Sequence, residues 1–171
     1  EPDSLAILKA LSLVTHIYHQ GDAPEMAALC AALWGANRTA FQFRETAKNI
    51  HRELGFVHWG DVLMYLTPQV FVPPLFDDAW DQWVRGREPD FFAALDRSPG
   101  LLERFSVRLQ DLPGREEPRA HLGAYFRSHI EKLGPDALTD AMTMRRICRI
   151  VESDPDKLAP ALAGVVRAST R

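Results

Sequence analysis

The sequence predicts a mainly α-helical protein that carries one β-hairpin in its N-terminal half. Apolar residues recur at helical spacing along most of the 171-residue chain. The stretch 55–68, GFVHWGDVLMYLTP, instead has two runs rich in aromatic and β-branched residues, separated by Gly60 and Asp61. Such runs around a two-residue Gly-Asp loop are typical of a hairpin, because Gly at the first turn position supplies the positive φ that a tight turn needs.

The composition is that of an ordinary globular protein, with 46% apolar and 25% charged residues. The net charge of −3 gives no overall attraction to nucleic acid or to an anionic membrane. No apolar run approaches the roughly 18 residues of a membrane span, and no secretory signal opens the chain, so we expect a cytoplasmic protein. Cys30 and Cys148 are then expected to be reduced packing thiols. Because the chain begins at Glu1 without an initiator methionine, we expect a processed product or a piece of a longer protein.

Three helices are predicted before the hairpin. The first covers 4–19, where apolar residues repeat at helical spacing, and Gly21 ends it. The second covers 22–34, with Asp22 as its N-cap. The third begins near residue 38 and reaches residue 54, with an apolar stripe formed by Phe43, Ala47, Ile50 and Leu54.

The order of these elements predicts a winged helix-turn-helix domain over residues 1–72. Gly55 follows the third helix as its C′ residue, and the hairpin over 56–66 is closed by Thr67-Pro68. Three helices and then a hairpin is the order of a winged helix, with the hairpin as the wing. The short Gly-containing turn at 35–37 is the connection expected between its second and third helices. The alternative is a plain helical bundle to which a hairpin has been added.

Residues 73–171 are predicted to form a helical domain, either a bundle or a solenoid-like array, with a candidate sub-boundary near 112–117. The last two helices look like a helical hairpin of the kind stacked in α-solenoids, although one pair does not establish a repeat. The predicted helices cover 75–84, 89–96, 99–111, 117–132, 135–152 and 155–168.

Large apolar side chains on the predicted inner faces are expected to be buried, because they form the apolar stripes of their elements. The residues concerned are Phe43, Ile50, Leu54, Trp59, Trp80 and Trp83.

The motifs of common catalytic and cofactor sites are missing from the sequence. It contains no phosphate-binding loop, no Gly-x-Gly-x-x-Gly, no Cys-x-x-Cys and no His-Glu-x-x-His. No accompanying carboxylate pattern raises a metal site above chance at any of His16, His19, His51 and His58. Three aspartates near the start of one short helix are explained by the helix dipole: Asp77, Asp78 and Asp81. We therefore predict no catalytic residue, no metal and no enzymatic activity for this chain.

The third helix carries the strongest functional pattern, a stripe of basic residues at i, i+4 and i+8. In a DNA-reading winged helix the third helix enters the major groove, so this stripe is a candidate contact to nucleic acid or to a protein partner. Glu45 and Glu53 interleave with the basic residues, which weakens the case for DNA. The candidate contact residues are Arg38, Arg44, Lys48, His51 and Arg52.

Three segments resemble the region that follows the nucleotide-binding core of STAND-type signalling NTPases: 5–13 (LAILKALSL), 52–59 (RELGFVHW) and 65–68 (YLTP). These NTPases are AAA+-related switches that include many bacterial antiviral sensors. The tail 147–157 (ICRIVESDPDK) is similar to a helical-repeat junction.

The resemblance implies a winged-helix domain that closes over ATP or ADP held by a neighbouring nucleotide-binding domain, followed by helical sensor repeats. Many family members carry a Met-His-Asp motif whose histidine approaches the nucleotide phosphate. This sequence has no such tripeptide, so no nucleotide-contacting residue carries over, and no cofactor is expected in this chain.

Two functional hypotheses remain at this point. The leading one is a regulatory and interaction module of a larger STAND-type NTPase switch, catalytically silent by itself, with a neighbouring nucleotide-binding domain or another protein as its partner. The alternative is a winged-helix transcriptional regulator that binds DNA and dimerises through its C-terminal helices.

Overall fold

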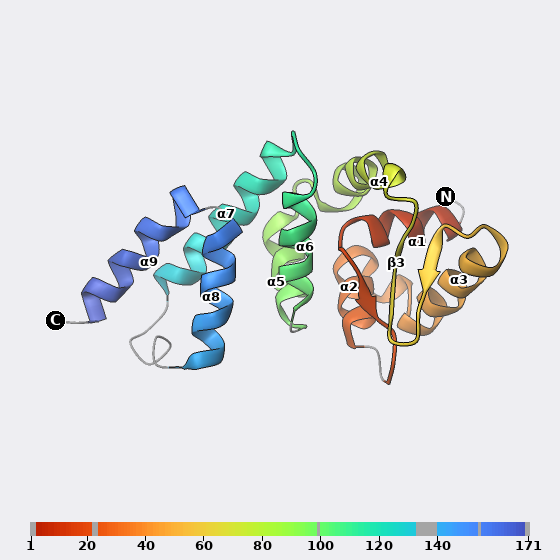
Figure 1. Cartoon of the computed structure of the whole chain (residues 1–171), viewed down its shortest axis with the longest axis horizontal. Helices are drawn as coiled ribbons and strands as arrows, with labels where there is room; N and C mark the ends of the chain where they lie inside the picture. The colour runs from red at the N-terminus through yellow and green to blue at the C-terminus, as the bar shows by residue number, and fades with distance from the viewer. Residues whose placement is uncertain (1–2, 22–23, 99, 133–139, 154, 170–171) are drawn as a thin grey trace. The chain divides into compact units, whose positions relative to one another are not determined.

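The computed structural model describes residues 3–21, 24–98, 100–132, 140–153 and 155–169 (Figure 1). Over these residues the protein is mainly helical, as predicted, with one small antiparallel sheet. The chain divides into two compact units, Glu1–Arg108 and Leu109–Arg171. The domain boundary predicted between residues 72 and 73 therefore lies inside the first unit, and the predicted sub-boundary near 112–117 lies just inside the second.

The first unit begins with helices and one short strand. The elements are α1 (Asp3–Ser12), β1 (Ile17–Tyr18), α2 (Pro24–Trp34), the 3₁₀ turn η1 (Gly35–Asn37) and α3 (Ala40–Glu53). Asp22, the predicted N-cap of α2, lies outside the described residues.

The first helix is shorter than predicted, and the prediction that it reaches residue 19 is wrong. It ends at Ser12, whose hydroxyl donates a hydrogen bond to the Lys9 carbonyl at 2.6 Å. Ile17 then enters a strand and is fully buried there. The apolar residues after Ser12 suit a buried helix as well as a buried strand, so their spacing did not separate the two.

The predicted hairpin is present and forms part of a three-stranded sheet. Its strands are β2 (Val57–Trp59) and β3 (Leu63–Leu66), and the strand order is β1-β3-β2 with both pairings antiparallel. The strand β1, which the sequence analysis did not predict, adds Ile17 opposite Met64. One face of this sheet is buried, and α1 and α3 pack against the hairpin (Figure 1).

The hairpin turn lies one residue later than predicted. Trp59 pairs with Met64, and the Gly60 N–H donates to the Leu63 carbonyl at 3.0 Å. This register places Asp61 and Val62 at the two central positions. Gly60 is not among the positive-φ glycines of the chain, so the reason given for a glycine at the first turn position was also wrong.

Both ends of α3 follow local chain chemistry. Thr39 is the N-cap, and with Gln42 it forms a capping box: the threonine hydroxyl accepts from the Gln42 N–H, and the glutamine side chain accepts from the Thr39 N–H. At the other end the N–H groups of Leu54 and Gly55 both donate to the Ile50 carbonyl at 3.0 Å. Gly55 has φ +69°, as expected for a C′ glycine.

The core confirms part of the predicted burial. Phe43, Ile50 and Trp80 are at most 2% exposed, whereas Trp59 and Trp83 are only half-buried. The prediction for Leu54 is wrong, because its side chain is 52% exposed. Leu54 is the C-cap of α3, where the chain turns away at Gly55, so the buried stripe of the helix ends one turn earlier.

The rest of the first unit packs around an aromatic core. Its elements are the turn η2 (Gln69–Phe71), α4 (Val72–Ala79), the π-helical segment η3 (Trp80–Val84), α5 (Glu88–Asp96) and α6 (Leu101–Gln110), whose last two residues belong to the second unit. The predicted helix over 75–84 thus corresponds to α4 with its π-helical end. Five large rings lie against one another and are nearly fully buried: Phe76, Trp80, Phe91, Phe92 and Phe105.

The second unit is helical throughout its described residues. It contains α7 (Glu116–Glu131), α8 (Ala141–Ser153) and α9 (Pro155–Ser169), and α9 packs against both other helices. The part of the predicted helix over 135–139 lies outside the described residues. In the part of the chain that the structure describes, every helix is too short or too polar to cross a membrane.

Candidate functional site

Arg44, the first residue of the predicted basic stripe, is used to hold the fold. It lies on α3 and is half-buried. Its Nη2 donates to the His19 carbonyl at 2.6 Å and to the Gly21 carbonyl at 3.2 Å, both in the segment between β1 and α2. Charged donors to backbone carbonyls are among the stronger hydrogen bonds in proteins. Arg44 therefore links α3 to the segment between β1 and α2, and its guanidinium contributes little to phosphate binding.

Lys48 has partners inside the same domain. Its Nζ lies 3.2 Å from Glu45 Oε1, one turn earlier on α3. The same ammonium lies 5.6 Å from the ring centroid of Trp59, within the range of a cation–π contact. Glu45, which interleaves with the stripe in the sequence, thus neutralises the lysine.

His51 anchors the first strand of the hairpin to α3. Its Nδ1 lies 2.8 Å from the Val57 carbonyl. Since a carbonyl only accepts, Nδ1 carries the proton in this contact. Val57 belongs to β2, an edge strand of the sheet, so the histidine occupies an acceptor that the edge would otherwise present to another chain.

The opposite edge of the sheet is blocked in the same way. The N–H of Tyr18 in β1 donates to Glu25 Oε2 at 2.9 Å. Side chains of α2 and α3 therefore satisfy backbone groups at both edges. This arrangement disfavours extension of the sheet by a further strand.

Arg38 also has intramolecular partners. It precedes α3, and its Nη2 lies 2.6 Å from Asp3 Oδ1 of α1. Its guanidinium lies over the ring of Trp34, 4.7 Å from the centroid. Arg52, in contrast, is exposed, and no described residue forms a hydrogen bond or ion pair with it. Of the five predicted contact residues, Arg52 alone presents its charge to solvent in this way within the described chain.

Exposed apolar side chains mark a surface that the sequence analysis missed. Val70 is 72% exposed and Leu54 52% exposed. The ring of Phe71 meets that of half-buried Phe56 with centroids 5.3 Å apart. We call Leu54, Phe56, Val70 and Phe71 the hairpin-base patch, because they precede and follow the hairpin. The run Val70-Phe71 outside any predicted element was the available sequence signal.

A second exposed apolar position lies at the start of α3. Phe41 is 71% exposed in the first helical turn. It lies off the buried stripe that begins at Phe43, and this offset was readable from the helical spacing. Large apolar side chains that remain in water are typical of protein contact surfaces when they gather together.

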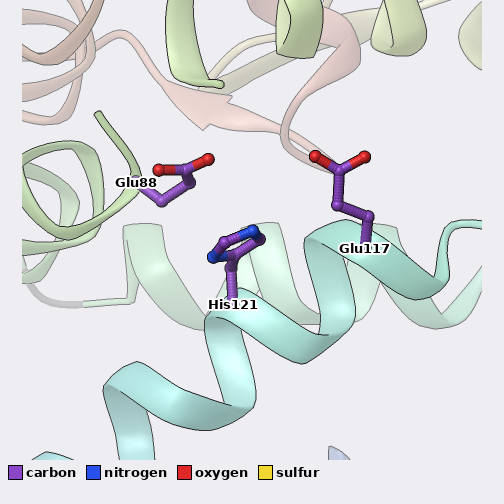
Figure 2. Close-up of side chains that lie close together, drawn as sticks. All are labelled: Glu88, Glu117 and His121. Carbon is purple, nitrogen blue, oxygen red and sulfur yellow. The ribbon is translucent and has the colours of Figure 1, made fainter. Parts of the chain in front are cut away.

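Within either unit, the described histidine, cysteine, aspartate and glutamate side chains do not form a complete set of metal ligands. On α7, Glu117 and His121 are one turn apart and project from the same side of the helix (Figure 2). Both are exposed, and two ligands fall short of the four of a structural zinc site. Glu88, at the start of α5 in the other unit, accepts a hydrogen bond from the Gly86 N–H at 2.8 Å.

The two cysteines differ in environment, and the prediction that both are packing thiols is wrong for one of them. Both are free, but Cys30 is buried and Cys148 is exposed. Burial raises the pKa of Cys30 to about 12, which the nearby Arg38 only partly opposes. A thiol with such a pKa has almost no thiolate at neutral pH, so Cys30 is unsuited to nucleophilic chemistry.

Comparison with known proteins does not assign the chain to a family. No family model matches the chain, and no curated protein or solved structure matches it either.

Proposed function

We propose that this chain is a non-catalytic regulatory and interaction module of a larger STAND-type NTPase switch of the kind found in bacterial antiviral defence. In this proposal residues 1–72 form a winged-helix domain with the hairpin as its wing. The element order α1-β1-α2-α3-β2-β3 and the strand order β1-β3-β2 support that assignment, since the short first strand completes the wing into a sheet. ATP or ADP would be held by a neighbouring cytoplasmic nucleotide-binding domain and not by this chain.

The observation that carries the proposal is the internal use of the basic stripe. Arg44 is bound to the carbonyls of His19 and Gly21, and Lys48 is paired with Glu45. Phosphate binding draws its affinity from basic side chains that exchange counterions for phosphates, so residues already paired within the domain contribute little. The same helix and hairpin expose Phe41 and the hairpin-base patch, which suit a protein partner.

One observation favours the alternative, which is a winged-helix DNA-binding regulator with C-terminal dimerisation helices. Arg52 is exposed on α3 and lies one turn beyond the paired Lys48. One basic residue accounts for one phosphate contact, whereas binders of duplex DNA usually combine several.

The gene that encodes the chain provides the first test. We expect the same reading frame to encode a Gly-x-x-x-x-Gly-Lys-Ser/Thr phosphate-binding loop upstream of Glu1. A start codon immediately before Glu1 would contradict the proposal of a switch module.

A binding experiment then tests the contact surface. The upstream nucleotide-binding domain, produced separately, should associate with this chain, and Phe41→Asp should weaken that association. Val107→Asp is the control, because Val107 is also an exposed apolar residue of the first unit, 38% exposed, but lies on α6 and not on α3. Equal weakening by both substitutions would show that the effect is not specific to the α3 surface.

A further inference from the structure

Two arginines of α6, one turn apart, contact the 13–18 segment, which contains β1. Arg108 is 4% exposed, and its Nε and Nη2 donate to the Val14 carbonyl at 3.2 and 2.9 Å. Arg104 forms an ion pair with Glu25 of α2 and lies over the ring of Tyr18, 5.1 Å from its centroid. We call Arg104, Arg108 and Glu25 the α6 clasp.

His16 lies beside this clasp. Its ring meets the Tyr18 ring edge to face, with centroids 5.5 Å apart, so His16 and Arg104 contact the same tyrosine. Its Nδ1 is 3.1 Å from Thr15 Oγ1, and the imidazole is half-buried. The charged groups that act on it are Arg104 and Arg108 from α6 and Glu25 from α2.

The charge balance of this cluster depends on the protonation of His16. With a neutral imidazole the clasp has two positive charges and one negative charge. Protonation adds a third positive charge beside the two arginines. Accordingly, burial lowers the pKa of His16, Arg104 lowers it further, and Glu25 only partly compensates.

The sign of the effect on stability follows by linkage. A histidine whose pKa is lower in the folded than in the unfolded state binds protons more weakly when folded. The clasped state therefore keeps its full stability above the unfolded-chain pKa of about 6.5 and loses stability as the pH falls below it.

We propose that His16 makes the α6 clasp acid-sensitive, so that protonation of its imidazole releases the 13–18 segment from α6. That segment contains β1, whose Ile17 and Tyr18 pair with Met64 and Leu63 of β3. Its release uncovers one edge of the sheet. This conformational device requires no partner and goes beyond the function proposed above.

Hydrogen exchange of the whole chain at pH 7.5, 6.5 and 5.5 tests the inference, with rates corrected for the intrinsic pH dependence of exchange. His16→Phe keeps a ring against Tyr18 and removes the titrating group. His58→Phe is the matched control, because His58 also stacks on a tyrosine, Tyr65, with centroids 4.6 Å apart, but on the exposed side of the hairpin.

In the wild type and in His58→Phe, we expect the opened population of the 13–18 segment to rise as the pH falls from 7.5 to 5.5, because the folded segment binds the His16 proton more weakly than the opened one. In His16→Phe the rise should be absent. An equal rise in His16→Phe, or no rise in the wild type, would overturn the proposal.

Should His16→Phe fail to fold, an NMR titration of His16 in the wild-type chain decides the matter. A titration midpoint below that of the urea-denatured chain is the expected result. A midpoint equal to or above it would overturn the proposal.

Discussion

Truncation of Ile50 to alanine tests the packing of α3 most sharply. Ile50 is 1% exposed on the inner stripe of α3, between Ala47 and the end of the helix. Leu54 is the next residue of the predicted stripe, yet it is 52% exposed. The two substitutions remove the same number of carbon atoms from neighbouring turns, so Leu54→Ala is a matched control for Ile50→Ala.

The expected magnitudes follow from burial. Ile50→Ala removes three buried carbons, which at about 0.8 kcal/mol each amounts to about 2.4 kcal/mol of lost transfer free energy. The cavity left in the core adds to this, so the free energy of unfolding should fall by about 2–5 kcal/mol. At Leu54 about half of the side chain is already in water, and the loss should be about 1 kcal/mol or less.

Urea unfolding followed by tryptophan fluorescence provides the assay. All four tryptophans, Trp34, Trp59, Trp80 and Trp83, belong to the first unit, so the signal reports on the unit that contains α3. A loss below about 0.5 kcal/mol for Ile50→Ala, or a larger loss for Leu54→Ala than for Ile50→Ala, would refute the packing described for this helix.

Three further substitutions or reactions have defined outcomes. Thr39→Ala removes the hydroxyl of the α3 capping box and should lower the free energy of unfolding by about 0.5–2 kcal/mol in the same assay; an unchanged value would exclude a working cap. Arg104→Ala leaves Glu25, with a side chain only 9% exposed, without its ion-pair partner, and should cost about 3–5 kcal/mol; a neutral result would show that solvent reaches the carboxylate. Iodoacetamide at neutral pH should modify exposed Cys148 and spare buried Cys30, whose pKa is about 12, as peptide mass analysis can establish; rapid modification of Cys30 in the folded chain would contradict its burial.

The features that local chemistry decides were predictable from the sequence. Gly55 at the end of α3 has the left-handed backbone expected of a C′ glycine, and the hairpin lies between strand-forming runs as expected. The strand at Ile17 was not predictable in this way, because its pairing with Met64 joins residues far apart in the sequence. The shape of the turn was likewise decided by the register between Trp59 and Met64, which the composition of the turn does not specify.

The candidate site was predictable in position but not in its partners. The spacing of Arg44, Lys48 and Arg52 placed them correctly on α3 and outside the buried stripe of Phe43 and Ile50. The partners of Arg44 are backbone carbonyls of another segment, and a carbonyl acceptor has no residue type to read in a sequence. Exposure of the hairpin-base patch depends on how the segment after β3 leaves the sheet, which is also decided by tertiary structure.

Titration of labelled duplex DNA with the purified chain, at low and at physiological salt, tests most directly the claim that the α3 stripe serves the fold and not DNA. We predict binding weaker than the roughly 10⁻⁴–10⁻⁶ M of ordinary non-specific binders at physiological salt. Arg52→Ala should leave the titration unchanged, and Arg44→Ala should lower the free energy of unfolding without altering the titration. Three phosphate contacts would instead give a salt slope of about −2.7. Sub-micromolar binding that collapses with salt, and that disappears when Arg44, Lys48 and Arg52 are all replaced by alanine, would contradict the account and identify a DNA-binding regulator.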